Sequence, residues 1–105
     1  MALKWPNKDP DEMLDYSVDW SRFLETETIS AVTWYVYDEN DVKQELSDAR
    51  VVNGLQFVSG TVSGQVATAR FGLGTNNVRY TVVCRVTTGG GLRYERSIFL
   101  RVKEK

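Results

Sequence analysis

The stretch VRYTVVCRVTTGGGLRYERSIFLRV, residues 78–102, decides the fold. Apolar and polar residues alternate on both sides of three consecutive glycines, a pattern typical of two half-buried strands joined by a turn. Placing Arg85 opposite Glu95 aligns the even-numbered side chains, and such cross-strand pairs contribute about 0.2–1 kcal/mol each. The facing pairs predicted in this way are Val82 with Ile98 and Tyr80 with Leu100. We therefore expect an antiparallel hairpin whose even-numbered side chains point inward.

Strand patterns recur along the rest of the chain. The segments are residues 14–20, 29–37, 54–59 and 65–71. Together with the hairpin, their spacing of roughly ten residues predicts an all-β, immunoglobulin-like antiparallel β-sandwich of about 6–7 strands. We expect residues 1–14 to form an extended N-terminal segment and residues 15–105 to form a single domain. The predicted structural core contains Trp20, Trp34, Tyr80, Val82, Cys84, Ile98 and Leu100.

The amino-acid composition restricts the classes of protein to which the chain can belong. A chain of 105 residues with 42% hydrophobic and 26% charged residues is long enough for one compact core and too short for two domains. No apolar run approaches the roughly 20 residues of a membrane helix, and the opening MALKWPNKDPDE lacks the apolar stretch of a signal peptide. A single cysteine excludes an internal disulfide, which fits a reducing cytoplasm. We expect a soluble protein that makes no membrane contact.

Charge is divided unequally along the chain. Residues 1–50 contain five Lys/Arg and twelve Asp/Glu, a net charge of −7, whereas residues 51–105 contain eight and two, a net charge of +6. The total of −1 argues against nucleic-acid binding. Two interpretations remain open. The charges compensate between neighbouring strands, or they form opposite surface patches that steer a partner or a second copy.

No catalytic, cofactor-binding or metal-binding residue is expected. The chain has no histidine to activate Cys84, which is interpreted as a small buried hydrophobe on the inward face of the hairpin. Asp38 and Asn40 have calcium-loop spacing, but Val42 and Lys43 stand where that loop needs a ligand and a glycine. The glycine-rich turns match no phosphate-binding pattern. We therefore expect no enzyme and no cofactor.

Outward-facing apolar residues form the candidate protein-interaction site. If Trp34 points inward, alternation turns its neighbours on the same strand outward. The candidates on this strand and on the hairpin are Tyr35, Tyr37, Val83 and Phe99. On adjacent strands they would form an apolar patch of the kind that marks protein–protein contacts. The alternative is that the polar insert DENDVKQELSDAR, residues 38–50, folds over them.

Several segments resemble one known family. KDPDEMLDYSVDW, ISAVTW, VSGTVSGQVATARF and VRYTVVCRVTTGGGLRYERSIFLRVKEK follow the order seen in small immunoglobulin-like virion proteins of tailed bacteriophages, described as fibre-to-tail adaptors. The likeness covers nearly the whole chain, and Tyr80 resembles the tyrosine corner of immunoglobulin-like domains. Two features depart from the family pattern: residues 38–50 resemble an insertion, and Cys84 has no partner cysteine.

The resemblance implies a structural virion protein of a phage or prophage that joins tail or neck proteins to tail fibres and is assembled in the cytoplasm of the bacterial host. Its partners would be other tail, neck or fibre proteins, with a homo-oligomer as a further option. Two alternatives come from other classes. An immunoglobulin-like carbohydrate-binding or adhesion module would need Tyr35 and Tyr37 as an exposed platform. A small hydrolase would need carboxylates such as Asp38 and Asp41, which lack the apolar surroundings that raise a carboxyl pKa.

Overall fold

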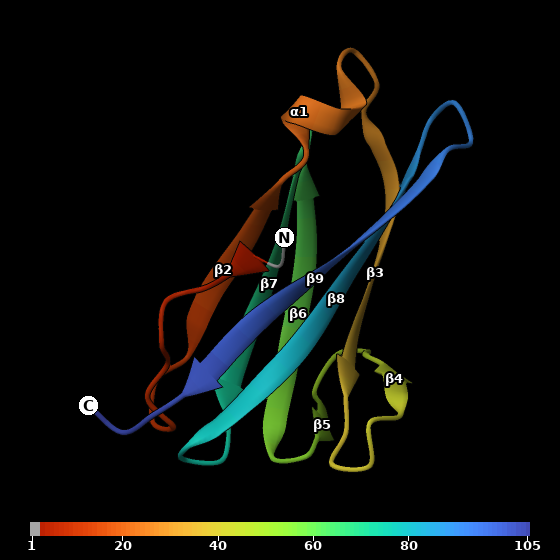
Figure 1. Cartoon of the computed structure of the whole chain (residues 1–105). Coiled ribbons are helices and arrows are strands. Elements are labelled where there is room, and N and C mark those ends of the chain that lie inside the picture. The colour runs from red at the N-terminus through yellow and green to blue at the C-terminus, as the bar shows by residue number, and fades with distance from the viewer. Residues whose placement is uncertain (1–2) are drawn as a thin grey trace.

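A computed structural model describes residues 3–105, which fold into two β-sheets packed face to face (Figure 1). The elements are β1 (Leu3–Lys4), β2 (Leu14–Asp19), α1 (Ser21–Leu24), β3 (Ile29–Tyr37), β4 (Lys43–Glu45), β5 (Arg50–Val52), β6 (Leu55–Ser63), β7 (Val66–Leu73), β8 (Val78–Thr88) and β9 (Arg93–Val102). One sheet has the order β1-β9-β8-β3-β4 and the other the order β2-β7-β6-β5. Neighbouring strands are antiparallel except for β1 and β9. The predicted all-β sandwich is confirmed.

The β8–β9 hairpin has the predicted register. Arg85 lies opposite Glu95, as the alternation of the sequence requires. The inward pairs Val82–Ile98 and Tyr80–Leu100 are also present. β8 lies between β9 and β3, so the hairpin forms the centre of the five-stranded sheet.

Three short strands form where the sequence predicts loops. β1 lies in the N-terminal segment, and β4 and the start of β5 lie in the polar insert. β4 pairs with the last three residues of β3, from Tyr35 to Tyr37. The insert therefore runs beside the outward residues of β3 as an edge strand and then crosses to the second sheet, where β5 pairs with β6 (Figure 1).

β6 is longer than predicted. It continues through Gly60 to Ser63, because Thr61 and Val62 pair with Thr68 and Ala67 of β7. β-Branched residues favour strands, and here they override the glycine as a turn signal. The remaining turn is Gly64–Gln65, where Gly64 has a φ of 59°.

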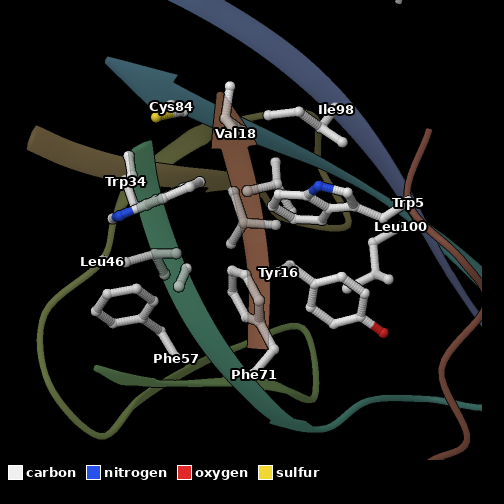
Figure 2. Packing of buried hydrophobic residues seen from close by; sticks show 14 of the residues in the cluster. Trp5, Tyr16, Val18, Trp34, Leu46, Phe57, Phe71, Cys84, Ile98 and Leu100 are labelled. Carbon is white, nitrogen blue, oxygen red and sulfur yellow. The ribbon is translucent and has the colours of Figure 1, made fainter. Parts of the chain in front are cut away.

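Aromatic residues from both sheets fill the core (Figure 2). Trp5 stacks on Tyr16 with ring centroids 4.9 Å apart, and Phe57 meets Phe71 edge-on at 5.8 Å. The core candidates proposed from the sequence have exposed fractions of 2% or less: Trp20, Trp34, Tyr80, Val82, Cys84, Ile98 and Leu100. Trp5 was not among those candidates, although it lies at the centre of the cluster.

The N-terminal segment is bonded to both sheets. The backbone N–H groups of Trp5 and Lys8 donate to the carbonyl oxygens of Phe99 and Arg101 on β9, each at 3.0 Å. The Lys8 side chain is fully buried, and its Nζ donates to the carbonyl oxygen of Leu73 at the end of β7, at 2.5 Å. The segment therefore links β9 of one sheet to β7 of the other.

Candidate interaction surfaces

The outer face of the five-stranded sheet carries most of the candidate residues. Odd-numbered side chains of β8 and β9 point away from the core, and the register places the outward residues of β1, β3 and β4 beside them. We call this surface the basic face. Its charged residues are Lys4, Lys43, Arg79, Arg85, Arg93, Arg101, Glu45 and Glu95. Because cations outnumber carboxylates here, much of the positive half of the chain forms one surface patch.

Tyr35 contacts two cations on the basic face. Lys43 Nζ lies 4.6 Å from the ring centroid, and Arg85 Cζ lies 4.9 Å from it. Both cations also pair with Glu95, at 2.9 and 2.8 Å. Charged side chains therefore lie over the ring of Tyr35. The ring is not the open aromatic platform that a sugar needs. Tyr37 lies next along β3, opposite Lys43, and is half-buried.

Phe99 marks the other end of the basic face. It is half-buried, and Arg79 Cζ lies 4.4 Å from its ring centroid. Lys4 on β1 is its partner in register. Together with Arg101, these residues line a shallow depression of about 180 Å³. An aromatic ring surrounded by cations is a suitable contact for an acidic protein surface.

Val83 differs from the expectation of an exposed patch residue, because it is only 1% exposed. It does point outward, between Tyr35 of β3 and Ser97 of β9, and is not part of the core cluster. The reason is its place on the central strand of the sheet, where flanking side chains shield the outer face. Exposure was therefore the wrong expectation for Val83.

The carboxylate of Asp38 is engaged in hydrogen bonds within its own loop. It accepts hydrogen bonds from the backbone N–H groups of Val42 and Asn40, at 3.0 and 2.9 Å, and from the Gln44 side chain at 2.9 Å. The bond from Val42 is the main reason that the pKa of this carboxyl is lowered. Within residues 3–105, no group of three or more His, Cys, Asp or Glu residues is placed to hold a metal ion.

Cys84 lies deep in the core and is fully buried. Burial raises the pKa of its thiol to about 12, so the thiol stays protonated near neutral pH. A protonated, inaccessible thiol is a poor nucleophile. Cys84 therefore packs as an apolar side chain.

Ion pairs also link the acidic and basic halves of the chain. Arg70 on β7 pairs with Asp15 on β2 at 2.7 Å, and Lys105 pairs with Glu12 at 2.8 Å. Both interpretations of the charge division thus hold in part. Neighbouring segments compensate at these pairs, while the basic face keeps an excess of cations. Among residues 3–105, no helix is long and apolar enough to cross a membrane.

A groove opens between the sheets on the side where the short strands β4 and β5 flank β3 and β6. We call it the edge groove; it holds about 620 Å³ and is lined by Val32, Thr33, Trp34, Glu45, Leu46, Ser47, Asp48, Phe57 and Gly60. None of these was among the interaction candidates from the sequence. A signal was present, since a glycine inside a strand often marks a close approach of another group.

The two-sheet sandwich and the buried tyrosine at its corner place the chain among immunoglobulin-like proteins. Tyr80 makes the hydrogen bonds of that corner, to the backbone of Asn53 and Thr75. The chain belongs to the podophage GP4 fiber-tail adaptor protein gp77 family, whose model matches residues 8–101. The match confirms the family resemblance seen in the sequence. No curated protein matches the chain.

Proposed function

We propose that this chain is a structural protein of a bacteriophage virion that joins tail or neck proteins to tail fibres through protein–protein contacts. The observation that carries this proposal is the adaptor-family match over residues 8–101. In this role the chain needs no catalytic residue and no cofactor. It is assembled in the host cytoplasm and binds neither nucleic acid nor membrane.

The basic face is the first contact surface that we assign to this role. Tyr35, Tyr37 and Phe99 provide aromatic area there, and their rings lie among lysine and arginine side chains. Interfaces are enriched in tyrosine, phenylalanine and arginine. Long-range attraction between this face and an acidic partner would speed encounter and select the partner. Several copies around a symmetric tail would combine weak contacts into a stable joint.

A phage in which this chain is not produced tests the proposal. We expect particles that contain heads and tails but lack fibres, and that regain fibres when the chain is supplied from a plasmid. A plasmid carrying Arg22→Glu, a change on α1 away from the basic face, is the control for expression and folding. Normal fibre content in particles without the chain would refute the adaptor role.

A further inference from the structure

At one edge of the four-stranded sheet, β6 has an outer neighbouring strand along only part of its length. β5 pairs with β6 through Leu55, Gln56 and Phe57, whereas Ser59 to Ser63 pair with β7 alone and Val58 lies at the register shift between them. Within the described part of the chain, no strand lies on the other side of residues 58–63. We call this segment the free edge of β6. At about 3.3 Å per residue it is roughly 20 Å long, which suits a strand of ordinary length.

The free edge of β6 borders the edge groove. On the opposite sheet, β4 and the Leu46 N–H cover β3 only from Trp34 to Tyr37, so the part of β3 before Trp34 is also open. The upper halves of β3 and β6 in Figure 1 accordingly lack an outer neighbour, whereas β4 and β5 flank their lower ends. Val62 has the same facing as buried Ala67, its partner on β7, yet it remains 39% exposed. An apolar side chain on the inward side of the free edge is thus left partly uncovered.

The floor of the edge groove contains an unpaired hydrogen-bond donor. Trp34 is 2% exposed, and its indole Nε1 has no hydrogen-bond partner among the described residues. By contrast, the Trp5 indole donates to the Ser17 carbonyl oxygen at 3.1 Å. Figure 2 shows the Trp34 nitrogen on the side of the ring that faces away from Trp5. Buried donors are nearly always paired. Among the described residues, the Tyr16 hydroxyl and the Trp20 indole are also unpaired, but of the three only Trp34 lines the edge groove, where a bound segment could supply an acceptor.

Gly60 on the free edge lies over the Trp34 nitrogen. A Cβ atom at this position would come within 3.1 Å of Trp34 Nε1 and of Phe57 Cζ. The lack of a side chain therefore lets the backbone of β6 approach the indole closely. Position 60 belongs both to the free edge and to the groove lining.

The charged residues at the ends of the free edge are acidic. Asp48, two residues before β5, lines the groove at one end. At the other end, Gln65 donates to the backbone oxygens of Glu25 and Glu27, which brings that acidic loop to the β6–β7 turn.

The arginines near the free edge are already engaged. Arg70, on the β7 side opposite Ser59, pairs with Asp15, and Arg50 donates to the backbone oxygen of Glu45 and to the Gln44 side chain. The free edge therefore favours an occupant that brings its own positive charge.

We propose that the free edge of β6 is the docking site for an extended segment of a partner protein. The segment adds as a strand beside β6, in line with β5, and its backbone pairs with the edge. Its inward side chains are apolar and cover Val62, one of its amide or hydroxyl oxygens accepts the Trp34 N–H, and lysine or arginine at its ends faces the acidic residues. This inference rests on the proposed adaptor function, because the partner is then the fibre or tail protein.

A pair of lysine substitutions tests the site. Val62→Lys places a charge toward the groove on the free edge, and such inward charges block strand addition. Thr61→Lys adds the same charge one residue away, on the outer face, and is the matched control. Both positions are exposed, so both variants should unfold at nearly the wild-type urea concentration. We expect Val62→Lys to weaken binding to the purified fibre or tail protein of the same virion by roughly tenfold or more, and Thr61→Lys to leave it unchanged.

Two measurements on the complex serve as a second test that does not depend on variants. Those amides of residues 58–63 that point away from β7 should exchange with solvent at least roughly tenfold more slowly in the complex than in the free chain. The Trp34 indole proton, assigned with Trp34→Phe, should shift downfield when the partner binds.

The outcomes separate the two proposals. Absence of binding to either virion protein would overturn the adaptor function and this site with it. Binding that leaves the exchange of residues 58–63 and the affinity of Val62→Lys unchanged would retain the adaptor and overturn the site. Protection of residues 58–63 in the isolated chain at high concentration would identify a second copy as the occupant, and would overturn the assignment to a partner protein.

Discussion

Tyr80 holds the turn at Asn53 in place: its hydroxyl donates a hydrogen bond to the Asn53 carbonyl oxygen at 2.7 Å. The Tyr80 hydroxyl oxygen also accepts a hydrogen bond from the backbone N–H of Thr75, at 2.9 Å. One buried phenol on β8 thus connects the β5–β6 turn of the other sheet with the β7–β8 turn, which links the two sheets. The end of the sandwich is fixed by hydrogen bonds as well as by packing.

Removing this hydroxyl should destabilise the fold. Tyr80→Phe leaves the Asn53 oxygen and the Thr75 N–H without their partner, so we expect a loss of about 1–3 kcal/mol in the free energy of unfolding. Urea titration measures the loss. Tyr37→Phe, at a half-buried position on the basic face, is the control and should change stability by less than about 0.5 kcal/mol. Equal stability of Tyr80→Phe and the wild type would show that the hydrogen bonds of the Tyr80 hydroxyl do not stabilise the fold.

The buried side chain of Lys8 should make the free energy of unfolding increase with pH. Burial lowers the pKa of Lys8, so above this pKa the folded chain releases a proton that the unfolded chain keeps until about pH 10.4. Between these two pKa values the unfolded state binds more protons than the folded state. The contribution of Lys8 to the free energy of unfolding therefore rises with pH. We expect the wild type to gain stability relative to Lys8→Met between neutral pH and pH 10, as measured by urea unfolding.

Lys103→Met is the control for the loss of a lysine charge. Lys103 is exposed and follows β9, so its replacement removes a lysine charge without removing a buried side chain. The account of Lys8 would be wrong if the difference between wild type and Lys8→Met were flat, or fell as pH increased.

Cys84 should not react in the folded protein. Its thiol is buried and its pKa is raised to about 12, so only about 1 in 10⁴ molecules would carry a thiolate at pH 8. We expect labelling by a disulfide reagent to proceed no faster than unfolding, and to become complete within seconds to minutes in concentrated urea. Rapid stoichiometric labelling in native buffer would contradict the buried position.

Charge reversal on the basic face should weaken partner binding. Arg79→Glu places a carboxylate beside Phe99, and we expect roughly a tenfold loss of affinity for the fibre or tail protein at low salt, about 1.4 kcal/mol. The loss should shrink as salt screens the interaction. Arg22→Glu on α1 causes the same change in net charge and should bind as the wild type does. If both variants lost affinity equally, total charge rather than the basic face would be responsible.

The hairpin could be predicted from sequence because its alternation is long and continuous. Val82, Cys84 and Val86 on β8 repeat at every second position, and this period fixes both the strand and its inward face. The same reasoning gave the exact span of β3, residues 29–37. Alternation identifies which face a side chain is on, and that information is local.

Exposure and isolated contacts depend on neighbours that the sequence does not identify. Val83 is on the predicted outward face, but the strands on either side of β8 shield it. Trp5 and Lys8 are buried although no periodic pattern surrounds them, since their places are set by β9 and by the end of β7. The edge groove exists because β5 has only three residues, and that length follows from tertiary packing.

The central claim is that this chain joins two virion proteins, and the mass of the assembled complex tests it most directly. The purified chain is mixed with the fibre protein and the tail protein of its virion, each alone and then together, and the mass of each mixture is measured by light scattering. The adaptor account predicts a complex with each protein and a ternary complex that forms only when this chain is present. Binding to neither protein, or fibre and tail proteins that associate equally well without this chain, would contradict it.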